Sequence, residues 1–316
     1  MRHILFFLPV TMLLAACTQD ELTEQTGAAL PEPIPLELTA AMGEAAATPA
    51  TRGTYDGDWD GMTSVKVKVY LHEMEYKVTA SPDNKTALLS PAKPLSSSDV
   101  SYWWINTDEY KSFRAWMPTT YALDTEFTLP ETWEKDDFAT FDILGTGKII
   151  HFSQRNAPVA FSHLLAKVVI NIQPSAYLET HSNSVAVQIC DLYNTGKLID
   201  ITEGLTKAGL EIGTGTGDKK AVTPYQTQSF GTTTPATYEA LVIPQAIGSG
   251  SKLKITVGNT ATYECGIDIT EFTGGYEYTF DIIVKEQGLE VSAGSSISWG
   301  TGGNGTGTVT IGETNG

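Results

Sequence analysis

Apolar and polar residues alternate along most of the chain. The alternation is clear in 65–71, 168–172 and 253–257, and the run over 276–284 is the longest. Period two is typical of β-strands that bury one face in a core. Helical periodicity is almost absent, with 202–208 as the best candidate for a helical turn. The pattern therefore predicts an all-β protein.

The first residues have the order of a secretory signal. Arg2 and His3 give a basic start, 4–16 is an apolar run, and Cys17 follows two alanines. A membrane-spanning helix needs about twenty residues, so this shorter run is expected to be removed. Small residues before a cysteine resemble the lipobox of bacterial lipoproteins, which implies lipidation at Cys17 and export to the outer membrane. The alternative is an ordinary signal peptide with an incidental cysteine.

The rest of the chain divides into predicted segments. Clusters of Pro, Gly, Asn and Ser separate short strands, a pattern that favours β-sandwiches. The exported part is long enough for two domains of about 140 residues, with a turn at 154–158 between them. We predict a signal peptide over 1–16, a tether over 17–35, an N-terminal sandwich over 36–157, a C-terminal sandwich over 158–300 and a Gly-rich tail over 301–316.

Net charge limits the kinds of binding partner, and the cysteine content limits the disulfides that the chain can form. The chain has 20 Lys and Arg against 37 Asp and Glu, a net charge of −17. Such a surface repels phosphate backbones, so nucleic acid is not expected as a partner. Besides Cys17 there are only Cys190 and Cys265. Two cysteines do not make a disulfide framework, and the sequence leaves open whether they pair.

Patterns for catalysis or metal binding are incomplete. Residues 56–61 match the first half of a calcium loop, but Val67 stands where the pattern requires Glu. The glycine-rich stretch 213–219 lacks the Gly-Lys-Ser/Thr ending of a phosphate loop. His163 is isolated from other ligands or nucleophiles, which favours a packing role. We predict no enzyme activity, no metal site and no cofactor.

Large aromatic side chains gather at Trp103, Trp104 and Trp116. In a β-sandwich such rings usually fill the core. The alternative is an exposed platform on which a sugar or a partner protein stacks. This alternative supports a second functional hypothesis, a monomeric outer-membrane lipoprotein that binds glycans through these tryptophans.

An ordered series of short segments runs through the chain and resembles the fimbrillin family, the lipoprotein precursors of protease-assembled (type V) pili. The resemblance covers nearly the whole mature chain. Its segments are 34–40, 51–52, 103–104, 113–118, 159–168, 238–245, 272–280 and 297–299.

The resemblance implies two tandem transthyretin-like β-sandwich domains with Greek-key-like antiparallel sheets, and a structural, adhesive role in a cell-surface fimbrium. It implies other copies or related pilus subunits as partners, together with a host protein or glycan as ligand. It also implies an arginine-specific protease, for which Arg52 before Gly53 matches the expected cleavage position. An ordinary exposed arginine is the alternative. The position as shaft, tip or anchor subunit stays open.

Strand exchange has its own support in the residues. Ile34, Leu36 and Leu38 stand at alternate positions and would fill a groove in the first domain. Their removal would expose apolar area and leave a sheet edge unpaired, which is a strong acceptor for another strand. Val309 and Ile311, after a Gly-rich run, are the predicted donor. This donor is short, which leaves room for a subunit that accepts a strand but does not donate one.

Overall fold

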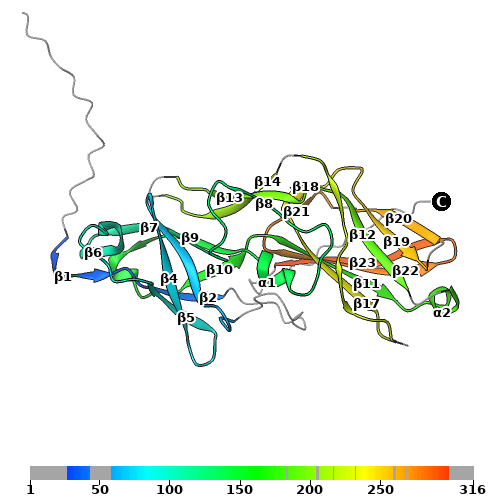
Figure 1. Ribbon diagram of the computed structural model, residues 1–316, viewed down its shortest axis with the longest axis horizontal. Helices are drawn as coiled ribbons and strands as arrows, with labels where there is room; N and C mark the ends of the chain where they lie inside the picture. The colour runs from blue at the N-terminus through cyan, green and yellow to red at the C-terminus, as the bar shows by residue number, and fades with distance from the viewer. Residues whose placement is uncertain are drawn as a thin grey trace, which may run out of the picture.

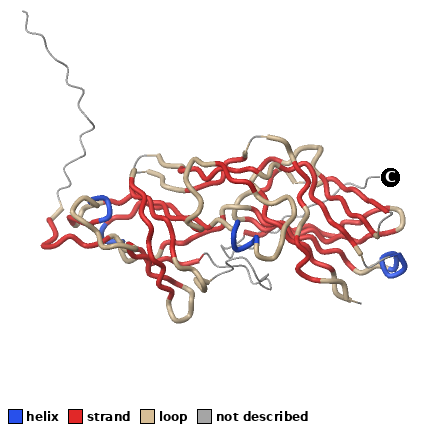
Figure 2. Tube along the Cα trace, in the orientation of Figure 1, coloured by secondary structure: helices blue, strands red, loops and turns tan. Residues whose placement is uncertain are grey.

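The structure, a computed structural model, describes residues 27–42 and 58–298, apart from 182–183, 204–205, 216, 232, 259–260 and 268. The molecule is elongated, with two β-rich halves in line (Figure 1). Strand β1 (Ala29–Pro35) lies at one end and helix α2 (Ala176–His181) at the other. Strands dominate and the helices are short (Figure 2). The predicted all-β class is confirmed.

Seven strands of the N-terminal half form one sheet that closes on itself, in the order β10-β2-β5-β4-β3-β7-β9. Strand β10 completes the closure, because it pairs antiparallel with β9 and parallel with β2. Val65, Val67 and Val69 are fully buried inside the sheet, and the lysines between them are partly exposed. The strands are β2 (Leu38–Met42), β3 (Ser64–Val69), β4 (His72–Ala80), β5 (Thr86–Pro91), β7 (Tyr110–Met117), β9 (Leu144–His151) and β10 (Val159–His163).

A two-stranded sheet covers the outer end of this half. Strand β1 pairs antiparallel with β6 (Trp103–Asn106), which places Ile34 opposite Trp104. Part of the predicted tether is therefore a strand, because β6 offers it a sheet edge and an aromatic neighbour. Two 3-10 turns, η1 (Val100–Tyr102) and η2 (Phe152–Gln154), precede β6 and follow β9.

Two packed sheets form the C-terminal half. Their strand orders are β16-β17-β11-β22-β23 and β15-β12-β19-β20. Ile170 and Phe280 of the first sheet and Ile189 and Ile255 of the second are fully buried in one core. Strands β11 and β22 pair parallel. The strands are β11 (Ala166–Gln173), β12 (Val185–Leu192), β15 (Lys220–Val222), β16 (Tyr225–Gln228), β17 (Ala236–Val242), β19 (Lys252–Val257), β20 (Ala261–Gly266), β22 (Tyr276–Lys285) and β23 (Gly288–Ser298).

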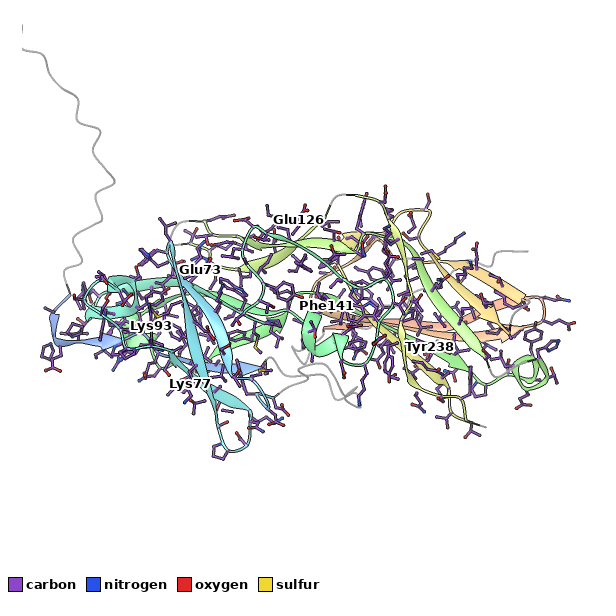
Figure 3. The ribbon with its side chains drawn as sticks, viewed as in Figure 1. Glu73, Lys77, Lys93, Glu126, Phe141 and Tyr238 are labelled. Carbon is purple, nitrogen blue, oxygen red and sulfur yellow. The ribbon has the colours of Figure 1, made fainter. Side chains whose placement is uncertain are left out.

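The connection between β7 and β9, residues 118–143, leaves the N-terminal sheet and packs on the C-terminal half. Its buried residues Leu129 and Trp133 belong to the C-terminal core. Phe141 lies where the two halves meet (Figure 3). The smaller elements in this region and nearby are β8 (Glu126–Thr128), α1 (Asp137–Phe141), β13 (Thr195–Asp200), β14 (Leu210–Thr214), β18 (Gln245–Ala246) and β21 (Glu271–Phe272), with β8 paired to β13 and β18 to β21.

The β13–β14 hairpin reaches in the opposite direction, onto the N-terminal half. The Asp200 carboxylate accepts hydrogen bonds from Lys68 Nζ at 2.9 Å and from Arg114 Nε at 2.7 Å. Burial raises the pKa of Asp200, but the hydrogen bonds from Thr202, Lys68 and Arg114 outweigh it and hold the pKa below its ordinary value. The carboxylate is therefore charged at neutral pH and ties the two halves together.

Strand β7 is buried on both faces and forms the joint. Phe113 and Ala115 point into the N-terminal core. Trp116 lies between Ala115 and Met117 in the sequence, but its side chain belongs to the C-terminal core and is fully buried. The indole N–H of Trp116 donates to the Tyr121 carbonyl at 2.9 Å.

The predicted division at residue 158 differs from the observed cores. Strand β10 belongs to the N-terminal sheet, so the change from one core to the other falls after His163. Segment 118–143 and the β13–β14 hairpin also cross between the halves. Local sequence patterns do not show which half a segment packs against, because the strands in these segments alternate like strands elsewhere in the chain.

A substitution at Gly147 tests how tightly the β13–β14 hairpin packs on the N-terminal half. A Cβ atom there would lie 2.5 Å from the Cα atom of Gly209, so the hairpin backbone would have to move. We expect Gly147→Ala to lower the free energy of unfolding by about 1–3 kcal/mol. Gly266→Ala is the control, because a Cβ atom there meets nothing within 4 Å, and it should stay within about 0.5 kcal/mol. Equal midpoints for both variants in urea unfolding would contradict a tight joint.

Candidate strand-exchange site

Strand β2 lies between β5 and β10 in the closed sheet. On one side it pairs antiparallel with β5, with Leu38 opposite Leu89. On the other side it pairs parallel with β10, with Ala40 opposite Val159. Without β2, strands β5 and β10 would each present an unpaired edge.

The inward side chains of this segment are part of the N-terminal core. Leu36 and Ala40 are 0% exposed and Leu38 is 1% exposed. The Leu36 N–H donates to the Tyr102 carbonyl at 2.7 Å, and the Tyr76 hydroxyl donates to the Leu36 carbonyl at 2.8 Å. Burial, with Tyr102 and Glu37 nearby, raises the pKa of Tyr76, so its hydroxyl stays a neutral donor. The segment is held by backbone pairing, apolar packing and one buried side-chain hydrogen bond.

Ile34 departs from the prediction that it shares a face with Leu36 and Leu38. It lies on β1 and is 38% exposed. Strand β1 ends at Pro35, and pairing resumes with new partners at Leu38. The period-two face inside the groove is therefore formed by Leu36, Leu38 and Ala40.

The groove that holds β2 has apolar walls. Ala87 and Leu89 come from β5, and Val159 and Phe161 come from β10, all in the same core. Trp59 packs edge-to-face on Phe161 with ring centroids 5.3 Å apart. An extended strand with alternating apolar side chains matches such walls.

The other predicted positions for processing and exchange lie outside the described residues. These are Cys17, Arg52, Gly53, Val309 and Ile311. Arg52 nevertheless falls between the end of β2 at Met42 and the next described residue, Asp58. A cut after Arg52 would therefore break the covalent link between β1–β2 and the remaining strands.

Trp104 and Trp116 fill the core, as expected for large rings in a β-sandwich, so the alternative of an exposed aromatic platform does not hold for them. Trp104 is 1% and Trp116 0% exposed, so neither ring can stack on a sugar. Trp104 packs edge-to-face on Phe152 at 5.6 Å between ring centroids, because β1 and the sheet cover it. Trp103 alone is partly exposed, and its indole N–H donates to the Ser96 carbonyl at 3.1 Å.

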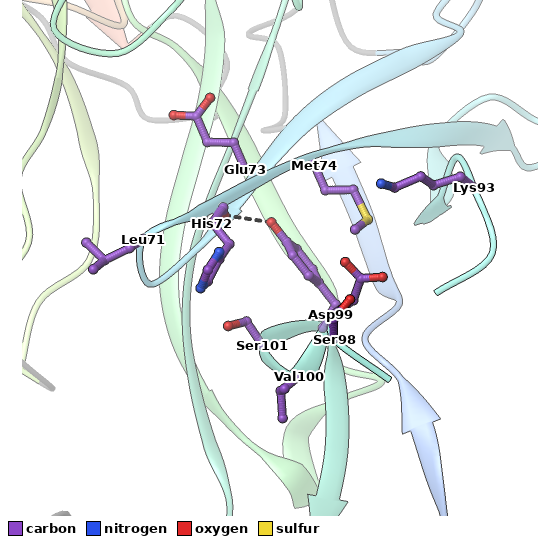
Figure 4. Close-up of a pocket in the computed structure, with 10 residues that line it drawn as sticks. Leu71, His72, Glu73, Met74, Lys93, Ser98, Asp99, Val100 and Ser101 are labelled. Carbon is purple, nitrogen blue, oxygen red and sulfur yellow. Dashed lines mark hydrogen bonds between the residues drawn. The ribbon is translucent and has the colours of Figure 1, made fainter. Parts of the chain in front are cut away.

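A small polar pocket of about 240 Å³ lies beside η1 (Figure 4). The Tyr102 hydroxyl at its base donates to the His72 carbonyl at 2.6 Å. Asp99 accepts from the backbone N–H of Ser96 at 2.8 Å and from its hydroxyl, and these bonds lower the pKa of Asp99. The polar groups at this pocket mainly hold the local turn. Across the described ranges no three His, Cys, Asp or Glu side chains are grouped to hold a metal ion.

His163 has the packing role predicted for it. It is 5% exposed, and its Nδ1 atom lies 2.8 Å from Asp142 Oδ1, which is fully buried. A second pocket, of about 410 Å³, lies next to His163 and Phe272.

Both cysteines among the described residues are free thiols. Cys190 on β12 is partly exposed, and Cys265 on β20 is buried. Burial raises the pKa of Cys265 to about 11, so this thiol stays protonated and unreactive at neutral pH.

The comparisons with known proteins agree with this architecture. The model of the fimbrillin-like family matches residues 51–299. The chain belongs to the fimbrillin-like family. Its members are structural proteins, so this chain is a fimbrial or adhesion subunit and not an enzyme, located at the cell surface or outside the cell.

Solved structures with the same fold include two candidate cell adhesion proteins. One, from Bacteroides uniformis, shares 16% identity with a TM-score of 0.57, over 84% of this chain and 98% of that chain. The other, from Bacteroides ovatus, shares 13% identity with a TM-score of 0.57, over 85% and 98%. The tip fimbrial protein Mfa3 of Porphyromonas gingivalis, with a C-terminal truncation, matches at 9% identity and a TM-score of 0.46, over 85% and 100%. No curated protein matches in sequence.

Within the described ranges, every helix is too short or too polar to cross a membrane.

Leu38 and Ile34 give a matched pair for testing the groove. We expect Leu38→Ala to lower the free energy of unfolding by about 2–5 kcal/mol, as for buried leucines elsewhere. Ile34→Ala, in the partly exposed part of the same segment, should cost less than about 1 kcal/mol. Thermal or urea unfolding of the purified chain measures both. A Leu38→Ala loss as small as that of Ile34→Ala would show that β2 is not a core strand.

Proposed function

We propose that this chain is a pilus subunit that polymerises by β-strand exchange after proteolytic removal of its own leading strands. The placement of β2 between β5 and β10 carries the proposal, because β2 precedes Arg52 whereas the other six strands of the closed sheet follow it. A subunit that loses this segment keeps the rest of its sheet and gains an acceptor groove.

Export and anchoring come first in the proposed sequence of events. Cys17 is lipidated, and the acyl chains hold the precursor at the outer membrane until it is processed. Two or three acyl chains suffice for stable anchoring, since each buried methylene contributes about 0.8 kcal/mol. The anchor is then lost together with β1 and β2 when an arginine-specific protease cuts between Arg52 and Gly53.

Cleavage alone does not empty the groove. Leu36 and Leu38 remain buried, and exposing each would cost about 1.5–3 kcal/mol. The Tyr76 hydrogen bond and the pairing with β5 and β10 add to this hold. Once the covalent link is cut, however, a second strand can compete for the same edges and walls. Strand exchange can then proceed without the unfolding of the whole subunit.

The proposed donor is the C-terminal tail of another copy or of a related subunit. Val309 and Ile311 are two residues apart, like Leu36 and Leu38, so they match the spacing of the groove walls. Residues 300–307 would reach about 26 Å at about 3.3 Å per residue. Because the donor and the acceptor lie on different parts of the chain, each addition leaves a new groove, and the assembly grows as a filament.

Digestion with an arginine-specific protease tests the proposal. The wild-type precursor should lose residues up to Arg52 and form ladders of polymer on non-boiled gels. Arg52→Ala should stay monomeric because β2 remains linked to the chain. The double variant Val309→Asp and Ile311→Asp should be cut normally but form no polymer, because carboxylates do not enter an apolar groove.

The wild type, Arg52→Ala and the double variant test strand exchange, the cleavage site and the donor residues separately. Cleavage without polymer in the wild type would contradict strand exchange. Normal polymer in the double variant would exclude these two residues as the donor. Polymer from Arg52→Ala would exclude cleavage at Arg52 as the trigger.

A further inference from the structure

Exposed apolar side chains gather at the outer end of the N-terminal half. Of eight large hydrophobic residues that are exposed in the described part of the chain, five form what we name the tip patch. Leu71 is the most exposed of them, at 88%. The tip patch consists of Tyr70, Leu71, Val100, Ile105 and Tyr110.

Hydrogen bonds and shared walls connect the members of the tip patch. The Tyr70 hydroxyl donates to the Tyr110 carbonyl at 2.8 Å. Leu71 and Val100 both line the small polar pocket (Figure 4). Ile105 and Tyr110 flank the turn between β6 and β7, where the Ile105 N–H donates to Glu109 at 2.9 Å. The patch is therefore one surface and not a set of scattered residues.

The turn that presents Leu71 is fixed. Tyr70 has a φ angle of +52°, in the left-handed region, and its N–H donates to the Ser112 carbonyl at 3.3 Å. The closed sheet thus holds a leucine out in water at a rigid hairpin tip. An exposed apolar cluster of this kind indicates a contact surface.

The start of the described chain lies next to the same surface. A Cβ atom at Gly27 would be 2.5 Å from the backbone nitrogen of Asp108, and the Thr107 N–H donates to the Ala28 carbonyl at 3.1 Å. Asp108 and Thr107 stand in the turn between Ile105 and Tyr110. The chain therefore enters the fold beside the turn that joins two members of the tip patch, Ile105 and Tyr110.

We propose that the tip patch rests on the surface of the lipid bilayer while the precursor is anchored. The inference depends on the proposed lipid at Cys17, since the ten residues from Cys17 to Gly27 reach at most about 33–36 Å. This short link keeps the tip patch, and not the C-terminal half, close to the membrane. Leucine and valine side chains favour the apolar side of the interface, and tyrosine favours the headgroup region.

Cleavage after Arg52 would then have a second consequence. It removes the link between the lipid and the folded subunit, and it leaves only the weak contact of a few side chains with the bilayer. The subunit would leave the membrane surface and enter the filament.

Amide hydrogen exchange on vesicles tests this contact. The chain from Thr18 onward, with an N-terminal hexahistidine tag in place of the lipid, is bound to phosphatidylcholine vesicles that contain nickel-chelating lipid. Amides of 70–72 and 104–106 should exchange about tenfold more slowly on vesicles than in solution at the same protein concentration. Leu71→Asp should abolish that protection. Leu88→Asp, which changes another exposed leucine on β5, should keep it.

Each outcome of the exchange experiment supports or overturns the contact between the tip patch and the bilayer. Equal exchange on and off the vesicles would overturn the proposal, as would protection that survives Leu71→Asp. Protection that appears in solution and rises with protein concentration would assign the patch to a second copy instead. Because the tag replaces the lipid, this test does not depend on lipidation. Lipidation is tested separately, by the mass of the N-terminal peptide of protein from the cell surface.

Discussion

Strand β2 lies between β5 and β10 in the closed N-terminal sheet, and its pairing with both strands is the interaction on which the rest of the structure depends. A closed sheet has no free edge, so the precursor is protected from association with other sheets. The closing strand comes from the beginning of the chain, and a single cut can free it from everything that follows. Under the proposed strand exchange, the contacts that hold β2 also define what a replacement strand must satisfy: two backbone edges, and apolar side chains at alternate positions.

The joint between the halves lies away from this closing strand. Lys68 and Arg114, which bind Asp200, belong to β3 and β7, and these strands are not neighbours of β2 in the sheet. Gly147 on β9 gives the β13–β14 hairpin its close approach. In the proposed strand exchange, the C-terminal half would support the part of the sheet that remains after β2 leaves. This arrangement favours an acceptor groove that keeps its shape during exchange.

The sequence was informative where one local pattern decides the structure. Alternation predicts the strands around Val65, Ile170 and Ile255, and it also predicts that Leu36 and Leu38 fill a groove in the first domain. The amino-acid sequence does not distinguish a core tryptophan from a partly exposed one, because Trp104 and Trp103 are adjacent in one strand and differ only in what covers them. The crossings of 118–143 and of the β13–β14 hairpin depend on contacts between distant segments. The prolines of β1 predict an extended linker, whereas the structure places them in a strand that pairs with β6, and an edge position tolerates proline.

The structure of filaments grown from the cleaved chain tests the central claim most directly. The strand exchange proposed here predicts that the position between β5 and β10 is filled by residues 308–311 of a neighbouring subunit, with Val309 and Ile311 where Leu36 and Leu38 pack in the precursor. A filament in which each subunit retains its own Leu38–Met42 strand between β5 and β10 would contradict it.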